Sequence, residues 1–257
     1  ISANLRDFTS VLETSMLNRR LYPLQLLASY HLAFSQNACN FSVPGAGKTS
    51  VVYGAYAYLK NLSQNDLKKV DRLLIIGPLS SFGPWESEYY ECFGRKATCK
   101  RLVGQISVEE KKQYLYDFNP AEITLLSYAS VPSLINELLH FLTANKVMVV
   151  LDEAHKIKNT DGGITATAVM QLAEKSKARV ILTGTPAPNG YEDLCNLFKF
   201  IWPTKNIIRF NSGQLKDMSK SENDPRVKTL LESLKPYFVR VRKSDLGIPP
   251  AINHPPI

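Results

Sequence analysis

Five short apolar runs, separated by longer amphipathic segments, restrict the fold of this sequence more than any other feature. Each run is apolar, as expected for strands that are covered on both faces. Strands that alternate with helical patterns favour a parallel sheet with helices on both sides. We therefore predict an α/β fold with a mostly parallel central sheet. The predicted strands are ACNFSV (38–43), RLLIIG (72–77), EITLLS (122–127), KVMVVL (146–151) and RVILT (179–183).

Helical patterns follow these strands. One of them begins with Ser107 and Glu110, which have the spacing of a capping box. The polar stretch 211–226 is predicted to be a loop or a mobile excursion. The proline-rich tail 247–257 is predicted to be a linker, because proline disfavours helices and central strands. The predicted helices are 48–62, 83–93, 107–118, 131–142 and 165–176.

Composition adds broad limits. The chain has 257 residues, enough for one large domain or two small ones, and a formal net charge of +8. Positive charge favours polyanion partners, but the basic residues form scattered pairs that fit a solvated surface equally well. The four cysteines form no CxxC pair, so we expect free thiols in a reducing compartment. This indicates the cytoplasm for a microbial protein and the nucleus for a eukaryotic one. No apolar stretch is long enough for a membrane span.

The sequence Pro44-Gly45-Ala46-Gly47-Lys48-Thr49 lies between a predicted strand and a predicted helix. Glycines there let successive N–H groups point at phosphate oxygens, and the helix N-terminus favours an anion. Lys48 can reach the β- and γ-phosphates of ATP, and the Thr49 hydroxyl can ligate Mg²⁺. The strict phosphate-loop pattern has glycine at position 42, where this chain has Ser42. The alternative is a simple glycine turn before a helix.

Two adjacent carboxylates, Asp152 and Glu153, end the fourth apolar run. Mg²⁺ prefers carboxylate and water oxygens, so Asp152 can hold this ion, directly or through water. Glu153 can polarise or deprotonate an attacking water molecule. An isolated Asp-Glu pair is usually a solvated surface feature, but here it shares the chain with a phosphate loop. The two motifs together predict binding of ATP and Mg²⁺.

Polar motifs follow all five predicted strands: PGAGKT, PLSSFGPW, Tyr128, DEAH and TGTP. Ligands of open α/β sheets bind beyond the carboxyl ends of the strands. If the strands are parallel, these motifs form one site at one edge of the sheet.

Taken together, these motifs resemble those of superfamily 2 helicase-like ATPases, specifically the SWI/SNF type of DNA translocase. The resemblance covers residues 21 to 250. LYPLQ (21–25) resembles the adenine-recognising segment, PGAGKT motif I, and LLIIGPLSSFGPWESEY motif Ia with its helix. ITLLSYASV resembles motif Ib, and LDEAHKIKN motif II, whose KIKN extension indicates the SWI/SNF type. LTGTPAPNGYEDLCNLFKFIWP resembles motif III, and YFVRVRKSDLGIPP the block that closes the first lobe. The family usually has an arginine and an aromatic residue where this chain has Tyr22 and Leu24, and a second arginine at Val241.

The resemblance implies a RecA-like three-layer sandwich and roles for individual residues. Glu153, Lys48 and His155 would be catalytic, and Thr49 and Asp152 would bind the metal. Thr183 and Thr185 would couple the nucleotide site to DNA, although turn formation explains them equally well. Trp85 could stack on a base, but its helix favours a place in the core. The nucleotide would contact Gln25, Pro44, Gly45, Ala46, Gly47, Lys48, Thr49 and Ser50, and nucleic acid would contact Ser80, Ser81, Ser127 and Asn189.

Members of the family clamp ATP between two RecA-like lobes, and we find motifs of the first lobe only. We therefore expect an N-terminal helical extension (1–20), the first lobe (21–246) and a linker (247–257) toward a second lobe of a longer chain. The expected partners are double-stranded DNA and that second lobe, with a nuclease or other accessory domains possible and no membrane. Two alternatives stay open: the motor subunit of a restriction or antiphage-defence system, and a non-catalytic module that binds nucleotide or DNA.

Overall fold

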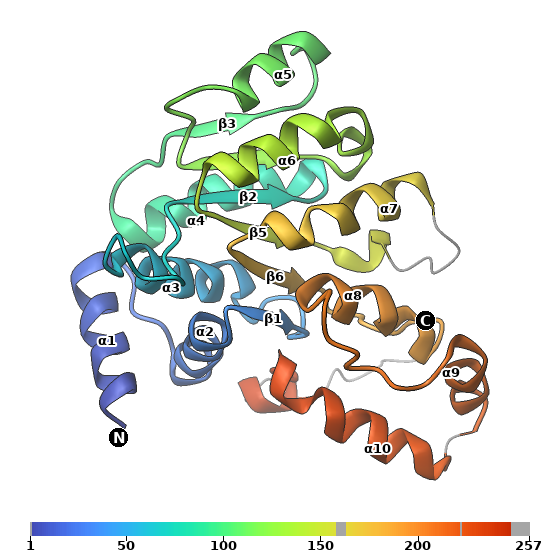
Figure 1. Cartoon of the computed structure of the whole chain (residues 1–257). Helices are drawn as coiled ribbons and strands as arrows, with labels where there is room; N and C mark the ends of the chain where they lie inside the picture. Colours follow the sequence, from blue (N-terminus) through green and yellow to red (C-terminus); the bar gives the residue numbers. More distant parts are fainter. Residues whose placement is uncertain (1, 158–162, 222, 248–257) are drawn as a thin grey trace, which may run out of the picture.

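The computed structural model describes residues 2–157, 163–221 and 223–247. Within them, a sheet with the strand order β3-β4-β2-β5-β6-β1-β7 forms the centre of the molecule (Figure 1). The pairings between its neighbouring strands are all parallel, which confirms the predicted sheet type. The strands are β1 (Asn37–Asn40), β2 (Arg72–Ile76), β3 (Cys99–Arg101), β4 (Ile123–Leu126), β5 (Val147–Leu151), β6 (Ala178–Leu182) and β7 (Phe238–Val239).

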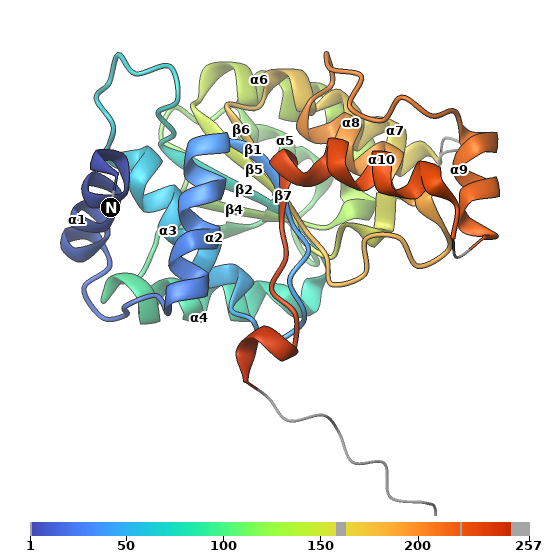
Figure 2. The same cartoon turned by 90° about the horizontal axis from the view of Figure 1, so that it is seen from below.

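Helices cover both faces of the sheet, so the fold is the expected three-layer sandwich (Figure 2). One face carries α1 (Ala3–Ser15), α2 (Pro23–Ser35), α3 (Lys48–Asn61) and α4 (Phe82–Phe93). The other face carries α5 (Val108–Leu115), α6 (Ile135–Ala144), α7 (Ile164–Gln171), α8 (Leu194–Ile201), α9 (Ser212–Ser219) and α10 (Pro225–Leu234).

Each central strand is buried on both faces because its side chains alternate between two cores. Leu73 and Ile75 of β2 pack with α1 to α4, whereas Leu74 and Ile76 pack with the helices of the opposite face. Side chains of a strand point alternately to the two faces of a sheet, so a strand between two helical layers is largely apolar on both faces. This requirement explains why the five continuous apolar runs could be identified in the sequence.

The predicted strands and helices are present, with shifted ends. Ser107 caps α5 through a reciprocal pair of hydrogen bonds with Glu110, which confirms the capping box. The helix that was predicted to begin at residue 131 begins later. Pro132–Leu134 form a 3₁₀ turn, and α6 begins at Ile135. The helix predicted over 165–176 ends earlier, because α7 is followed by another 3₁₀ turn at Ala173–Lys175.

The prediction of a loop at 211–226 is wrong, because α9 and the start of α10 occupy this stretch. Asn211 and Gln214 cap α9 reciprocally, and Asp224 caps α10 directly before Pro225. Only two residues of α9, Leu215 and Met218, are buried, so the apolar signal in the sequence is weak. The predicted linker lies, apart from residue 247, outside the described residues. No helix in the described ranges has the length and apolar character needed to cross a membrane.

Candidate nucleotide-binding site

The carboxyl ends of β1, β2, β4, β5 and β6 meet at one edge of the sheet, because these strands are parallel and in register. Leu182 at the end of β6 lies beside Asn40 of β1, and Leu151 of β5 lies beside Ile76 of β2. The phosphate-loop, carboxylate and TGTP motifs therefore follow neighbouring strands, as predicted. From β4 to β1, the expected DNA-contacting serines come first and the phosphate loop comes last.

The phosphate loop turns sharply between β1 and α3. Gly45 and Gly47 have φ values of +81° and +74°, in the left-handed region that residues with a side chain rarely adopt. Gly47 precedes Lys48, the first residue of α3. The free N–H groups of the first helical turn and the positive end of the helix dipole therefore lie at this loop, as an anion site requires.

Lys48 lies against its own loop. Its Nζ atom donates to the backbone oxygens of Ser42, at 3.1 Å, and of Val43, at 3.4 Å. Burial lowers the pKa of Lys48, and the charges of Glu153 and Asp152 act in the opposite direction. The ammonium group is thus close enough to sense both carboxylates, which brings the two sequence motifs into one electrostatic environment.

Ser42, the departure from the strict phosphate-loop pattern, has a structural role. Its buried hydroxyl accepts a hydrogen bond from the N–H of Val241, at 2.9 Å. The N–H of Val43 also donates to the oxygen of Val241, at 3.1 Å. The segment after β7 is therefore bonded directly to the start of the phosphate loop, and a glycine at position 42 would lack one of these bonds.

Gln25 connects α2 with the phosphate loop. Its side-chain oxygen accepts from the N–H of Tyr22, at 3.1 Å, and its Nε2 donates to the oxygen of Ala46, at 3.2 Å. A Cβ atom on Gly47 would lie 2.3 Å from this Nε2, so glycine is required for the close approach. A cavity of about 460 Å³ opens beside this contact. Its lining residues are Tyr22, Pro23, Leu24, Gln25, Gly45, Ala46, Val241, Asp245 and Leu246.

Asp152 and Glu153 lie directly after β5. The N–H of Asp152 donates to the oxygen of Ile76, at 2.8 Å, which extends the β2–β5 pairing by one residue. Its Oδ1 accepts from the N–H of Glu153, at 3.0 Å. Glu153 has a φ of +49°, a conformation that is uncommon for a residue with a side chain and frequent at functional sites. This turn keeps the two carboxylates half-buried at the edge of the sheet.

His155 lies in a 3₁₀ turn after this pair. Its Nδ1 is 3.2 Å from Oε2 of Glu153, an ion-pair distance, but the geometry is not that of a hydrogen bond. Within the described part of the chain, this buried nitrogen has no hydrogen-bond partner. Lys158 and Asn159 of the KIKN extension lie outside the described residues.

The TGTP motif packs against the phosphate loop. Thr183 is buried, and its N–H donates to the oxygen of Asn40 at the end of β1. A Cβ atom on Gly184 would lie 3.2 Å from Cδ of Pro44, so the two loops are in close contact. The Thr183 hydroxyl accepts from the N–H of Thr185, at 3.2 Å, which is the turn geometry expected of a threonine beside glycine.

Ser50, predicted to contact the nucleotide, has its hydroxyl engaged elsewhere. It is buried and hydrogen-bonded to Glu88 of α4, and Arg19 contacts both groups. Only the backbone N–H of Ser50 could then serve an anion at the start of α3. Arg19, for which no role was predicted, therefore anchors the segment between α1 and α2 to α3 and α4.

The predicted nucleic-acid residues fall into two groups. Ser80, Ser81 and Ser127 follow the neighbouring strands β2 and β4. The Ser81 and Ser127 hydroxyls make local contacts, to the oxygen of Pro78 and to Ser130, at 2.9 and 3.0 Å. Asn189 lies in an exposed loop after β6, on the other side of β5. The N–H of Asn189 donates to Oδ2 of Asp193.

The residues present fit a Mg²⁺ ion that is shared with phosphate oxygens. In the described ranges, no group of three or more His, Cys, Asp or Glu side chains is placed to hold a metal. Mg²⁺ bound with a nucleotide needs no such cage, because one or two protein ligands suffice beside phosphates and water. Thr49 at the start of α3 and Asp152 at the end of β5 would supply these ligands.

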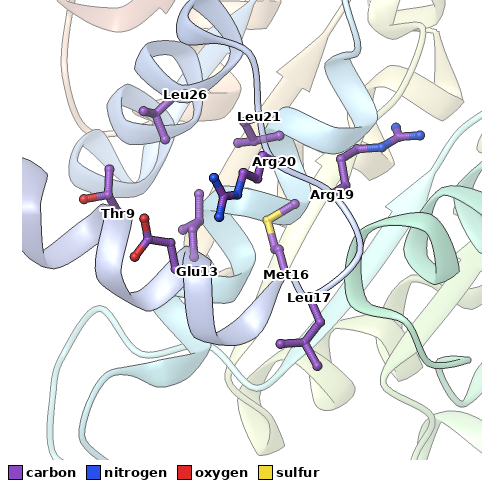
Figure 3. A pocket seen from close by; sticks show the side chains of 9 residues that line it. Thr9, Glu13, Met16, Leu17, Arg19, Arg20, Leu21 and Leu26 are labelled. Carbon is purple, nitrogen blue, oxygen red and sulfur yellow. The ribbon is translucent and has the colours of Figure 1, made fainter.

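A second hollow, of about 230 Å³, lies between α1, the segment that follows it and α2 (Figure 3). It is lined by Thr9, Leu12, Glu13, Met16, Leu17, Arg19, Arg20, Leu21 and Leu26. Leu21 belongs to the LYPLQ segment, but none of the individual residues predicted to contact the nucleotide lines this hollow. The hollow therefore belongs to the packing of the N-terminal helix and not to the site at the sheet edge.

Sequence reasoning missed several residues of the site. Val241, Asp245 and Leu246 line the cavity although they follow the phosphate loop by about 200 positions in the chain. Trp85 is in the core, as favoured, yet its Nε1 donates to Oδ2 of Asp152, at 3.0 Å. No local pattern in the sequence indicates such long-range contacts.

Comparison with known proteins gives a consistent result. The model of the SNF2-related domain matches residues 41–255. Among curated proteins, the chain is 25% identical over 230 residues to the ATP-dependent helicase FUN30 of Saccharomyces cerevisiae, covering 82% of this chain and 19% of that protein. It is 30% identical over 167 residues to a DNA repair and recombination protein RAD54-like of Drosophila mojavensis, covering 62% of this chain and 20% of that protein.

A solved structure is also similar: the Sulfolobus solfataricus SWI2/SNF2 ATPase core in complex with dsDNA. Its TM-score is 0.70 at 25% sequence identity, and the match covers 93% of this chain and 48% of that one. The present chain thus spans about half of that structure and about a fifth of the two curated relatives.

Proposed function

The chain belongs to the SNF2-related domain family, and from this premise we propose that it is the ATP-binding lobe of an ATPase that moves along double-stranded DNA. The observation that supports this most is the meeting of three features at one sheet edge. These features are the phosphate loop after β1, the carboxylates after β5 and the cavity beside Gln25. The phosphate loop and the carboxylates have the chemistry that Mg·ATP requires, and the fold brings them together from positions more than 100 residues apart.

In this proposal the adenine lies in the cavity between the start of α2 and the segment after β7. Tyr22 and Leu246 supply apolar surface there, and the amide of Gln25 recognises the edge of the base. Gln25 already contacts the phosphate loop through Ala46, so base and phosphates are bound by connected parts of the protein. Polar groups that pair with the base give selectivity, because a wrong base leaves them unpaired.

The triphosphate would lie on the N–H groups of Gly47, Lys48 and Thr49 at the start of α3, whereas the N–H of Ala46 donates to the oxygen of Val43, at 3.2 Å. Lys48 exchanges its contacts with the oxygens of Ser42 and Val43 for contacts with phosphate oxygens. Thr49 and Asp152 would hold Mg²⁺, which would offset the charge of the phosphates. Glu153 would take the proton of the attacking water. His155, which lies beside Glu153, would couple the nucleotide site to the DNA-contacting segments.

Duplex DNA is the proposed partner on the side of β2 and β4. Ser80, Ser81 and Ser127 would contact its phosphates, which position a protein on DNA without reading sequence. The formal net charge of +8 supports binding of a polyanion. The similar Sulfolobus core was solved with double-stranded DNA and is about twice as long as the matched part of this chain. We therefore propose that a second lobe completes the site, as that length allows.

Lys48→Ala tests the proposed phosphate site. Loss of a charged hydrogen-bond donor should weaken binding of Mg·ATP by about tenfold to a hundredfold, measured by calorimetry. Lys68→Ala is the matched control, because it removes the same charge from an exposed position before β2, at the opposite edge of the sheet. Equal affinity in Lys48→Ala and the control would overturn the phosphate-loop assignment.

Glu153→Gln tests the proposed base in the intact protein. ATP affinity should be retained, whereas hydrolysis should fall about a hundredfold or more, because general-base catalysis contributes an effect of this size. Steady-state phosphate release gives the rate, and calorimetry gives the affinity. Normal hydrolysis in this variant would show that Glu153 is not the base. Binding without measurable hydrolysis in the unmodified protein would favour a non-catalytic nucleotide-binding module.

A further inference from the structure

Asp152, the proposed metal ligand, is held by side chains from two other elements. Its Oδ2 accepts from Nε1 of Trp85, at 3.0 Å, and its backbone oxygen accepts from the hydroxyl of Tyr128, at 2.9 Å. The remaining carboxylate oxygen, Oδ1, accepts from the N–H of Glu153. Both carboxylate oxygens and the backbone oxygen of one residue are therefore fixed, which is unusual for a side chain that only needs to be solvated.

Trp85 is itself rigidly placed. Its side chain is 1% exposed in α4 and packs edge-on against the ring of Tyr53 of α3, with ring centres 5.4 Å apart. The Tyr53 hydroxyl donates to the backbone oxygen of Trp85, at 2.5 Å. Burial explains why an aromatic ring lies here, but not why its N–H points at Asp152. The other tryptophan, Trp202, has a buried Nε1 without a hydrogen-bond partner among the described residues.

Tyr128 reaches Asp152 from the opposite face of the sheet. It is 8% exposed, lies in the 3₁₀ turn after β4 and packs in the core with α5 to α10. Trp85 packs in the core with α1 to α4. Asp152 thus receives one donor from each helical layer, and together these donors restrict both its side chain and its backbone.

The two donors follow the segments that are proposed to contact DNA. Trp85 lies four residues after Ser81, and Tyr128 comes directly after Ser127. A displacement of either serine segment would therefore be transmitted to Asp152 through a single rigid aromatic side chain. Groups that hold a metal ligand by hydrogen bonds set its orientation and its affinity for the metal.

We propose that Trp85 and Tyr128 are positioning residues that orient Asp152 for Mg·ATP and couple it to the DNA-contacting segments after β2 and β4. The inference rests on the proposed function, since it needs Mg·ATP at Asp152. Neither residue touches the nucleotide. Both act through the hydrogen bonds that they donate to Asp152.

The first experiment compares ATP affinity with Mg²⁺ and with EDTA in Trp85→Phe and Tyr128→Phe. Each change removes a donor and keeps an aromatic ring. The gain in affinity on adding Mg²⁺ should fall about tenfold in Trp85→Phe, while affinity in EDTA stays unchanged. Tyr128→Phe should show a loss in the same direction. A merely structural role would lower both affinities together and leave their ratio unchanged.

Tyr89→Phe is the matched control. Tyr89 is a fully buried residue of the same helix, but its hydroxyl donates to Glu122, which lies before β4 and not at the nucleotide edge. This variant should keep the normal ratio of the two affinities. If Trp85→Phe and Tyr128→Phe both behave like Tyr89→Phe while Mg·ATP binds normally, the positioning role is wrong and the proposed function stands. If the unmodified chain binds no Mg·ATP, both proposals fail.

The second experiment tests the coupling to DNA in the intact protein. The ratio of ATPase rates with and without duplex DNA should fall several-fold in Trp85→Phe and in Tyr128→Phe, at saturating Mg·ATP. It should be unchanged in Tyr89→Phe. Full stimulation by DNA in both positioning variants would overturn the coupling.

A third measurement observes the contact directly. In a Trp202→Phe background, Trp85 gives the sole indole N–H resonance in the NMR spectrum, since the chain has two tryptophans. This resonance should move on Asp152→Ala substitution and on addition of Mg·ATP. A resonance that responds to neither would show that the hydrogen bond does not exist in solution.

Discussion

At the scale of single residues, Gly45 and Gly47 share a left-handed backbone but differ in their surroundings. A Cβ atom on Gly45 would meet no atom within 4 Å, whereas one on Gly47 would lie 2.3 Å from Nε2 of Gln25. Alanine at either position should cost about 1–2 kcal/mol of stability, because an L-residue is strained there. Only alanine at position 47 should also displace Gln25 from Ala46.

The two glycines therefore give a prediction about nucleotide selectivity. In Gly47→Ala, the preference for ATP over GTP should fall about five- to tenfold, toward that of Gln25→Ala, because the base-recognising amide loses its support. Gly45→Ala should keep the preference even if overall affinity falls. Competition binding of the two nucleotides measures this ratio. An unchanged ratio in Gly47→Ala would contradict the role assigned to Gln25.

The positions of the candidate site residues could be predicted from the sequence wherever a local pattern encodes them. The glycines, Lys48 and the Asp152-Glu153 pair are adjacent to strand ends, and backbone geometry alone brings them together. The hydroxyl of Ser42 and the indole of Trp85 were not predicted, because their partners lie 199 and 67 residues away. Such contacts depend on how whole elements pack, which no local spacing records.

At the scale of elements, a buried carboxylate connects three elements at the amino end of the sheet. Glu122, before β4, accepts hydrogen bonds from Lys60 and Tyr56 of α3 and from Tyr89 of α4. Arg95 adds two further bonds, at 3.1 and 3.3 Å. Burial raises the pKa of Glu122, but the bonds from Arg95 and Lys60 outweigh burial and lower it to about 2.

This network predicts a specific acid sensitivity. A carboxyl whose pKa falls on folding stabilises the native state above its ordinary pKa of 4.5, and this contribution disappears as pH falls toward 2. The contribution is about 3 kcal/mol. Glu122→Gln should therefore be less stable at pH 7 and should lose less stability between pH 5 and pH 2. Urea unfolding at several pH values measures this difference.

Glu109→Gln is the control, because Glu109 is exposed in the first turn of α5. It should lose stability on acidification to the same extent as the unmodified chain. Parallel pH profiles for Glu122→Gln and the control would exclude the assigned role of the network.

Apart from α2, a largely apolar helix of 13 residues, several elements that were not predicted are short or polar. Strand β3 has the sequence CKR and β7 only two residues, so neither forms an apolar run. They pair at the two edges of the sheet, where one partner strand is enough. Helices α9 and α10 were missed although their caps, Asn211 with Gln214 and Asp224 with Pro225, are visible in the sequence.

At the scale of the whole molecule, the described residues of the proposed nucleotide site lie at one edge of the sheet. The cavity beside Gln25 is lined by no arginine among the described residues. ATPases of this kind need an arginine to stabilise the charge of the transition state, and it can come from another part of the protein. Under the proposed function, we therefore expect these residues to bind the nucleotide and another part of the protein to supply the arginine.

The isolated 257-residue chain should therefore bind Mg·ATP but turn it over at least a hundredfold more slowly than the intact protein with DNA. Steady-state phosphate release, with and without duplex DNA, checks this prediction for both forms. The Lys48→Ala chain gives the background rate. Equal DNA-stimulated turnover by the isolated chain and the intact protein would show that these residues alone complete the active site.

The position of β1 in the sheet also determines when the phosphate loop can form during synthesis. Its two neighbours, β6 and β7, come from residues 178–182 and 238–239, long after the loop itself has left the ribosome. At roughly 5–20 residues per second, the loop waits on the order of ten seconds for its supporting strands. Until then ATP has no preformed cradle to bind, so the nucleotide cannot assist the early steps of folding. Under the proposed function, ATP can stabilise only a chain that has been synthesised past Val239.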